Sequence, residues 1–371
     1  MMSDALSFDA YMADVPDCRQ AGKIAYPLNE VLLLCLCAVV SGCESFVDIA
    51  EYGAEKLEFL RELAAFDHGA PSHDTLSTVF RHLDGEAFSK AFIAWAKATR
   101  QRLGRGPGGV VAIDGKTVRG SKDRDGAALH LISAFCDDMA MVLGQRASSA
   151  KKNEIADIPQ LLELLHIEGC IITIDAMGCQ KAIADKICAK NADYLLALKG
   201  NQGTLHEDVK LWFTDDEALA CCAFCETLDN DKGRFETRKY WICDDIDWLV
   251  QRHPGWRGLK SIAMVCATRE LNGKISIQRR FYISSLPANA KTFANAARGH
   301  WGIENRLHWV LDMVFGDDHC RVRKDNGPNN LCIIKHMAIN LINKAKGNKS
   351  IRLMRKKAGW NNKLLKQILK S

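Results

Sequence analysis

The chain has 371 residues, enough for two or three domains, and its 47% hydrophobic and 26% charged residues exclude an intrinsically disordered protein. The longest apolar run, residues 31–40, is shorter than the ~20 residues that cross a bilayer, and the first residues lack a secretory signal. We therefore expect a cytoplasmic protein with no membrane partner. The net charge of +5 is unevenly distributed, because residues 326–371 contain 11 Lys or Arg and no Asp or Glu. Such a segment slightly favours nucleic-acid binding over an ordinary solvated end.

The first hundred residues have apolar positions three and four apart, which predicts helices. We expect these helices over residues 28–40, 46–63, 74–83 and 86–102, and assign residues 1–105 to an N-terminal helical domain. The last two flank a turn, so they form either a DNA-reading helix-turn-helix or an ordinary packed bundle. The 10 basic and 15 acidic residues before Gly109 favour the bundle.

A stretch rich in glycine and proline, residues 104–109, precedes a change of periodicity and indicates a domain boundary. Beyond it, three consecutive strands and then alternating helices and strands predict a mixed α/β sheet. The expected strands cover residues 110–113, 128–135, 139–145, 170–174 and 194–198, and the expected helices cover 153–166 and 180–190.

Residues 201–287 interrupt this alternation. The apolar segments 261–268 and 275–284 flank an Asn-Gly pair, which favours the tight turn of a β-hairpin. We expect a β-rich insertion there, with Trp241, Trp248 and Trp256 packed in its core rather than stacked on a displaced base. Helices are expected again over residues 290–298, 301–314 and 331–345, followed by a basic tail, residues 346–371.

Two aspartates follow apolar strands. Asp114 closes the segment Val-Ala-Ile-Asp-Gly-Lys, and Asp175 closes Ile-Thr-Ile-Asp-Ala. An aspartate in this position either caps the following turn or holds a divalent cation at the edge of the sheet. Two such residues on strands that can be neighbours favour the cation site more than either residue does alone.

A third carboxylate lies on the helix expected over residues 301–314. Trp301, Glu304 and His308 are three and four positions apart, so they share one helix face. A carboxylate among apolar side chains is costly unless a cation lies against it. Two Asp and one Glu can hold two Mg²⁺ ions about 4 Å apart, which activate the attacking oxygen and stabilise the leaving oxygen of a phosphoryl transfer.

Phosphoryl transfer of this kind needs a polyanionic substrate, and basic residues follow the carboxylate segments. Lys116 and Arg119 follow the first Asp, and Lys199 follows the last strand before the insertion. Each of them is either a phosphate contact or an ordinary solvated loop charge.

A second group of possible metal ligands lies downstream of Glu304. It comprises His308, Asp312, Asp317, Asp318 and His319. For its aspartates we favour a structural role, in which Asp317 and Asp318 cap the turn after the helix and pair with Arg321 and Arg323.

Four separated segments together resemble the DDE transposases of bacterial insertion sequences, in the branch associated with H repeats. They are AIDGKTVRGS around Asp114, TIDAMGCQ around Asp175, LALKGNQ around Lys199 and RGHWGIENRLHWVLDMVFGDD around Glu304. The resemblance implies an RNase-H-like catalytic core, residues 106–200 and 288–345, divided by the β-rich insertion and joined to the N-terminal helical domain. It also implies that Asp114, Asp175 and Glu304 form a catalytic triad that binds two Mg²⁺ ions, or Mn²⁺.

The activity implied is that of a DNA transposase, which cleaves the ends of an insertion sequence and transfers the 3′-hydroxyl ends into target DNA. The partners implied are double-stranded DNA, as terminal inverted repeats and target, and a second copy of the chain in a synaptic homodimer at the bacterial nucleoid. Two alternatives remain open. One is an inactive or domesticated DNA-binding derivative, and the other is a metal nuclease that only hydrolyses.

One departure concerns the helix that carries Glu304. Broader relatives often place Tyr, Arg and Lys on this helix where the chain has Ala297, His300 and Leu311, so Arg298 and Arg306 are expected to substitute for them. The whole set of expected DNA contacts is Lys116, Arg119, Lys199, Arg298, Asn305, Arg306, Arg355, Lys356 and Lys357.

Overall fold

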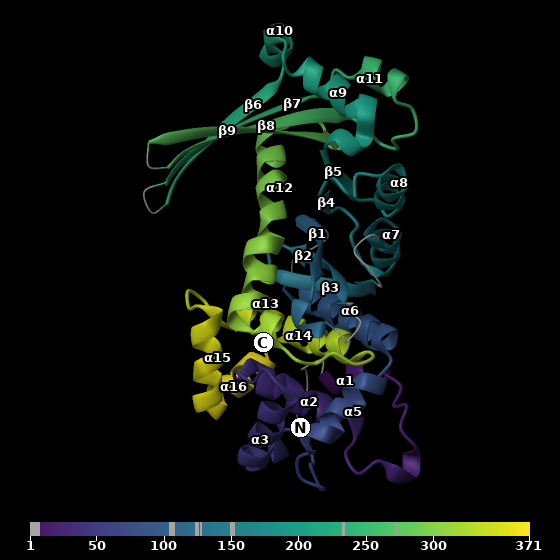
Figure 1. The fold of residues 1–371 in the computed structure, drawn as a ribbon, viewed down its shortest axis with the longest axis vertical. Coiled ribbons are helices and arrows are strands. Elements are labelled where there is room, and N and C mark those ends of the chain that lie inside the picture. Colours follow the sequence, from purple (N-terminus) through teal and green to yellow (C-terminus); the bar gives the residue numbers. More distant parts are fainter. Residues whose placement is uncertain are drawn as a thin grey trace.

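The computed structural model describes residues 8–103, 108–122, 126, 128–148, 153–231, 234–271 and 273–371. Residues 104–107, on which the first expected domain boundary falls, lie outside this set. The fold is mixed α/β and is built on one nine-stranded sheet with the strand order β3-β2-β1-β4-β5-β9-β8-β7-β6 (Figure 1). In the described part of the chain, no helix has both the length and the apolar character needed to cross a membrane.

One half of the sheet is formed by β1 (Val110–Thr117), β2 (His130–Cys136), β3 (Met141–Ser148), β4 (Ile171–Ile174) and β5 (Asp193–Leu198). β1 is antiparallel to β2 and parallel to β4, and β4 is parallel to β5. Helices α7 (Glu154–Leu164) and α8 (Lys181–Ala189) lie on one face of this half, and α12 (Ala290–Gly302) lies on the other (Figure 1). Helices on both faces explain why these strands read as continuous apolar runs.

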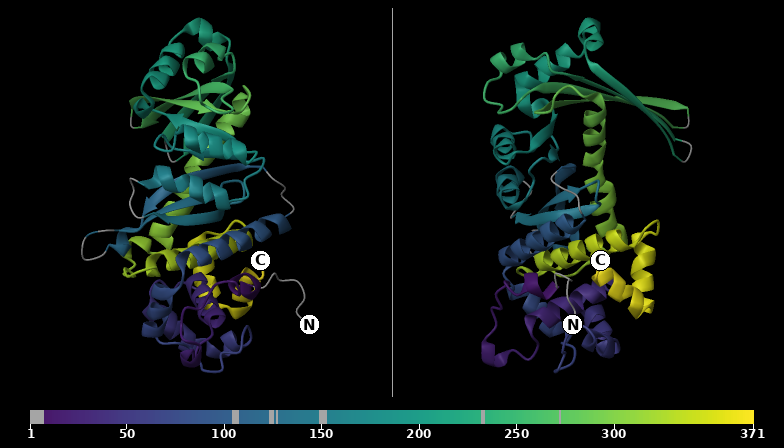
Figure 2. Two further views of the ribbon diagram at one scale, coloured as in Figure 1. Left: turned by 90° about the vertical axis from the view of Figure 1, so that its right-hand side faces the viewer. Right: turned by 180° about the vertical axis from the view of Figure 1, so that it is seen from behind.

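The insertion extends the same sheet. Its strands are β6 (Ala223–Asp231), β7 (Arg234–Cys243), β8 (Ser261–Leu271) and β9 (Lys274–Ser284). The predicted hairpin is confirmed as β8 and β9, and β9 joins the sheet by antiparallel pairing with β5. The far ends of the four strands project from the body as an arm (Figures 1 and 2). Three short helices accompany them: α9 (Gly203–Trp212), α10 (Asp216–Ala220) and α11 (Asp247–Arg252).

The three tryptophans of the insertion differ in burial. Trp256 is buried in the core, as predicted. Trp241 is half-buried, with its ring centroid 5.2 Å from that of Phe224. Trp248 is 37% exposed, so its predicted place in the core is wrong.

The N-terminal helices pack on one another and on a long C-terminal helix, and the last of them contacts the sheet. They are α1 (Phe8–Met12), α2 (Leu28–Val40), α3 (Phe46–Glu55), α4 (Leu57–Arg61), α5 (His73–His82) and α6 (Gly85–Arg102). α6 lies against β3 and against α14 (Gly327–Ala345), and its Phe88 and Phe92 are fully buried. Because this packing covers α6, it is not free to enter a DNA groove, and the packed-bundle interpretation holds.

The basic tail is folded. It forms α15 (Ile351–Trp360) and α16 (Asn362–Leu369), which contact α2 and α14 and bury Met354, Leu365 and Ile368 in the main core. The positive charge of this segment therefore lies on amphipathic helices that complete the N-terminal bundle, rather than on a solvated extension.

Arg355 of α15 is inside the protein, with a side chain only 5% exposed. Its guanidinium donates hydrogen bonds to the carbonyl oxygens of Val39 (3.1 Å), Cys43 (3.2 Å) and Val314, and it lies 4.1 Å from the ring centroid of Phe315. These contacts give Arg355 a structural role, which corrects its prediction as a DNA contact. Of its neighbours, Lys356 is exposed and Lys357 is half-buried.

We expect Arg355→Ala to lower the free energy of unfolding by about 3 kcal/mol, because three carbonyl groups lose a charged donor inside the protein. Lys356→Ala, next to it on the exposed face, is the matched control and is expected to change stability by less than about 0.5 kcal/mol. Urea unfolding of both variants measures the difference. Equal effects would contradict the structural role of Arg355.

Candidate active site

Strands β1 and β4 bring Asp114 and Asp175 side by side. The parallel register pairs Ile113 with Ile174, so the two aspartates are the next residues of adjacent strands, which lie about 4.8 Å apart. β1 continues beyond Asp114, contrary to the prediction, but from there it pairs only with β2. Beyond Ile113 the side of β1 that faces β4 therefore has no strand partner, and both carboxylates are half-buried there.

Glu304 reaches the site from a continuous helix. The predicted break after Arg298 is wrong, because α12 runs to Gly302 and continues through a π turn, Ile303–His308, into α13 (Trp309–Val314). A π turn inside an α-helix is uncommon and often occurs at a functional site. Here it separates side chains that were expected on one face. Trp301 and Glu304 line the same cavities, whereas His308 lies against Asp114, with Nδ1 3.6 Å from Oδ2.

The three carboxylates lie within range of one another's charge. Burial raises the pKa of Asp114 to about 7, and the charges of Asp175, Glu304 and Glu154 contribute to the rise. Burial also raises the pKa of Glu304, where Arg280 opposes the shift and Asp175 adds to it. The site therefore concentrates negative charge in a partly desolvated place, which a cation would relieve.

The side-chain chemistry of Asp114, Asp175 and Glu304 suits a hard divalent cation. All three donors are carboxylate oxygens, and two of them follow paired residues of adjacent strands. Asp175 also caps its turn, since Oδ1 accepts hydrogen bonds from the N–H groups of Met177 (3.0 Å) and Gly178 (3.3 Å). The turn-capping role of Asp175 is therefore compatible with a role as a cation ligand. Within the described ranges, no three His, Cys, Asp or Glu side chains form a ready-made metal cluster.

Lys116 is committed to the protein interior. Its Nζ lies 2.6 Å from Asp312 Oδ1 and 3.8 Å from Asp317 Oδ2, and the side chain is 9% exposed. Lys116 therefore belongs to an ion-pair network close to Asp114 and does not have the expected role of a phosphate contact. Arg119, at 79% side-chain exposure, remains open to solvent.

The acidic residues after α13 form ion pairs, although not with the expected partners. Asp317 pairs with Lys335 at 2.6 Å, and Asp318 lies 3.7 Å from Arg119. Their predicted pairing with Arg321 and Arg323 is wrong. Because Asp312, Asp317 and Asp318 all neutralise cations, the structural role that the sequence favoured for this group is the better description.

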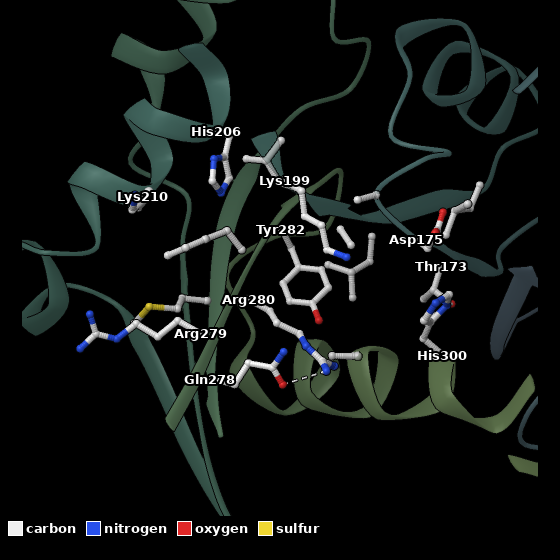
Figure 3. A pocket seen from close by; sticks show the side chains of 18 of the residues that line it. Thr173, Asp175, Lys199, His206, Lys210, Gln278, Arg279, Arg280, Tyr282 and His300 are labelled. Carbon is white, nitrogen blue, oxygen red and sulfur yellow. Dashed lines mark hydrogen bonds between the residues drawn. The ribbon is translucent and has the colours of Figure 1, made fainter. Parts of the chain in front are cut away.

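A cavity of about 590 Å³ opens beside Asp175 and Glu304 (Figure 3). Lys199 is exposed and extends towards the Asp175 side of this cavity. The remaining basic residues of its lining are His206, Lys210, Arg279, Arg280 and His300. Apart from His300, these lie in the insertion and were not predicted as site residues. For Arg280 the sequence signal is the alternation along residues 274–284, which places it on one face with Gln278 and Tyr282.

The other expected DNA contacts on the long helix have different surroundings. Arg298 is half-exposed and lies 3.1 Å from Asp229 Oδ2. Arg306 donates to the carboxylate and to the carbonyl of Asp137, both at 2.8 Å. Asn305 is exposed and lines a second cavity of about 340 Å³.

The raised pKa of Asp114 predicts a pH-dependent stability. In the unfolded chain this carboxyl has a pKa of about 3.9. Folding raises it to about 7, so the metal-free protein loses stability as the pH rises through this window. We expect Asp114→Asn to be more stable than the unsubstituted protein by about 2 kcal/mol at pH 8 and similar to it at pH 4.

Thermal or urea unfolding at the two pH values checks this expectation. Added Mg²⁺ serves as the control, because an ion that binds only the folded state raises the stability of the unsubstituted protein and not that of Asp114→Asn. The same stability difference at pH 4 and pH 8 would contradict the raised pKa.

Comparison with known proteins shows that the chain belongs to the DDE transposase family. The model described as "Transposase DDE domain" matches residues 105–341, and the model described as "DDE_Tnp_1-associated" matches residues 10–96. These matches confirm the resemblance carried by the sequence motifs.

Curated relatives are similar over nearly the whole chain. "Putative transposase YncI" of Escherichia coli O157:H7 is 39% identical over 97% of this chain and 94% of its own length. "H repeat-associated putative transposase YhhI" of Escherichia coli K12 is 37% identical over 97% of this chain and 96% of its own length. A solved piggyBac transposase synaptic complex with hairpin DNA aligns with 98% of this chain and 76% of that chain, at 11% identity and a TM-score of 0.43.

Proposed function

We propose that this protein is a DNA transposase that cleaves the ends of an insertion sequence and transfers their 3′-hydroxyl groups into target DNA. The observation that carries the proposal is that Asp114 and Asp175 follow paired residues of adjacent strands and that Asp175 and Glu304 line one cavity, in a chain of the DDE transposase family. The proposed catalytic core is RNase-H-like and comprises residues 106–200 and 288–345. Residues 1–105, 201–287 and 346–371 are the proposed N-terminal domain, insertion and basic tail.

In this proposal the three carboxylates hold two Mg²⁺ ions, for which Mn²⁺ can substitute. The ions supply charge stabilisation to the attacking and leaving oxygens of the phosphodiester. The open edge of β1 gives the DNA backbone access to Asp114, and the partial burial of the site strengthens each charge interaction there. The network of Lys116 with Asp312 fixes the strand from which Asp114 projects.

The proposed DNA contacts are two cations and one amide side chain that remain accessible around this edge. Lys199 lies beside Asp175, Arg119 lies on the loop after β1, and Asn305 follows Glu304. Exposed basic groups in these places neutralise backbone phosphates and favour association at low salt. Lys356, Lys357 and the outer faces of Arg298 and Arg306 extend the proposed surface, and a second copy of the chain completes a synaptic dimer.

The test is an assay with the purified full chain, Mg²⁺ and labelled DNA that carries the terminal repeats of the element. Strand cleavage followed by joining of the 3′ ends to a second DNA supports the transposase. Cleavage without joining indicates the hydrolysis-only nuclease, and binding without cleavage indicates the DNA-binding derivative. Omission of the divalent ion is the control, and activity that persists without it contradicts the proposed chemistry.

A further inference from the structure

Arg280 lies on the strand of the insertion that passes the catalytic helix. It is part of β9, in register with Val265 of β8, and it shares one face of the strand with Gln278 and Tyr282. This face is turned towards α12, whereas Arg279 points to the other side (Figure 3). The insertion thus places one arginine beside the helix that leads to Glu304.

Two contacts hold the Arg280 side chain in place. Its Cζ lies 4.5 Å from the centroid of the Trp301 ring, and its Nη2 donates a hydrogen bond of 3.0 Å to Gln278 Oε1. A guanidinium stacked on an aromatic ring is restrained in its plane, while the N–H groups at its edge stay available for hydrogen bonds. Arg280 is therefore pre-oriented before any ligand arrives.

The other three arginines that line the 340 Å³ cavity are neutralised by carboxylates, and Arg280 is not. Arg238 and Arg269 lie 2.6 Å and 2.8 Å from the carboxylate oxygens of Glu236, and Arg298 lies 3.1 Å from Asp229. In the part of the chain that the structure describes, Arg280 forms no ion pair, and its contacts are with uncharged side chains. A stacked arginine without a carboxylate partner is an available anion-binding group.

Arg280 is also close to the candidate catalytic carboxylates. Arg280, Trp301 and Glu304 line both the 590 Å³ and the 340 Å³ cavities. The charge of Arg280 acts on Glu304 across this space, although the two groups are not paired. An anion that enters here meets a fixed guanidinium on one side and the carboxylates, with their ions, on the other.

We propose that Arg280 is a phosphate-binding residue of the cleavage site, whose guanidinium holds a DNA backbone phosphate next to Glu304. The inference rests on the proposed function and deepens it. It gives the insertion a direct part in the active site, because β9 supplies the residue and Trp301 of the catalytic helix orients it. A bidentate contact to two phosphate oxygens matches the geometry of the guanidinium group.

The experiment compares Arg280→Ala and Arg280→Lys with the control Lys274→Ala, which removes an exposed cation from the far end of the same strand. Cleavage is measured in a single turnover with saturating protein, and folding is checked by thermal unfolding. Loss of a charge-assisted contact predicts cleavage about 10- to 100-fold slower in Arg280→Ala. Arg280→Lys keeps the charge and loses the planar group, so its rate is expected between those of Arg280→Ala and the unsubstituted protein. Lys274→Ala is expected within about threefold of the unsubstituted protein.

DNA in which single phosphates are replaced by neutral methylphosphonates identifies the contact. At one position the replacement is expected to slow the unsubstituted protein and the Lys274→Ala variant, to slow Arg280→Lys less, and to cause no further loss in Arg280→Ala. A purely structural role leaves every variant equally sensitive at every position, which would overturn the inference.

Failure of the proposed function gives a different result. If the unsubstituted protein binds the DNA without cutting it, the transposase proposal fails. The binding affinity of each variant is then measured for the same series of methylphosphonate-substituted DNAs. Loss of sensitivity at one phosphate in Arg280→Ala alone still supports the contact. Unchanged sensitivity in that variant rejects it.

Discussion

Asp114→Asn, Asp175→Asn and Glu304→Gln are each expected to lower the rate of DNA cleavage by about 10³-fold or more. Each change removes one charged oxygen donor from the proposed metal site. Such a site supplies several kcal/mol of charge stabilisation to a phosphoryl transfer, and each 1.36 kcal/mol corresponds to a factor of ten in rate. Single-turnover cleavage of labelled terminal-repeat DNA in the presence of Mg²⁺ measures the effect.

The matched control is Asp318→Asn, which removes a nearby carboxylate that lies 3.7 Å from Arg119 and 4.0 Å from Lys116. It is expected to keep most of the cleavage activity. All four variants should still bind DNA, because the proposed phosphate contacts are separate side chains and the loss of negative charge does not oppose binding. Substantial cleavage by any one of the three triad variants would remove that residue from the proposed triad.

The elements around the three candidate carboxylates are predictable from local sequence. The strands of the first half of the sheet are short apolar runs bounded by polar turns, and the spacing of three and four marks most of the helices. Asp114 and Asp175 are recognisable because each follows such a run. Their side-by-side position follows once β1 and β4 are neighbours, which the register of Ile113 with Ile174 establishes.

The parts that the sequence did not predict depend on contacts between distant segments. The amphipathic pattern of residues 351–369 is visible, but burial of Arg355 depends on carbonyl groups of α2 and of the loop after it, more than 300 positions away in the chain. The pairing of β9 with β5 is also non-local, and it joins the strand that carries Arg280 to the part of the sheet that carries Asp175. The π turn has no composition signal, so the separation of His308 from the face of Glu304 could not be read from spacing.

The partners in the ion pairs next to the candidate site were also not predictable from local sequence. Asp317 was expected to pair with arginines a few positions away, whereas it pairs with Lys335 on α14. Both side chains are buried, so packing of α14 decides the partner. Although burial alone disfavours a charged ammonium group, the charge of Asp317 raises the pKa of Lys335 above its usual value. The pair therefore stays ionised inside the protein and joins α14 to the segment that follows α13.

This buried pair leads to a second large expected effect. Asp317→Asn is expected to lower the free energy of unfolding by about 4 kcal/mol, because Lys335 is left as a buried ammonium group without a carboxylate. Asp318→Asn, whose side chain is 30% exposed, is the matched control and is expected to cost less than about 1 kcal/mol. Urea unfolding at neutral pH measures both. A small effect at Asp317 would mean that water or Asp312 compensates the charge of Lys335.

The double variant Asp317→Leu with Lys335→Met separates the charge from the packing. Replacement of both partners by apolar groups of similar size removes the unpaired charge, so we expect most of the lost stability to return. Cleavage activity should return with it, since neither residue faces the DNA and both act on Asp114 only through the fold. If the double variant is stable but inactive, the buried pair also positions Lys116, and through it the strand that carries Asp114.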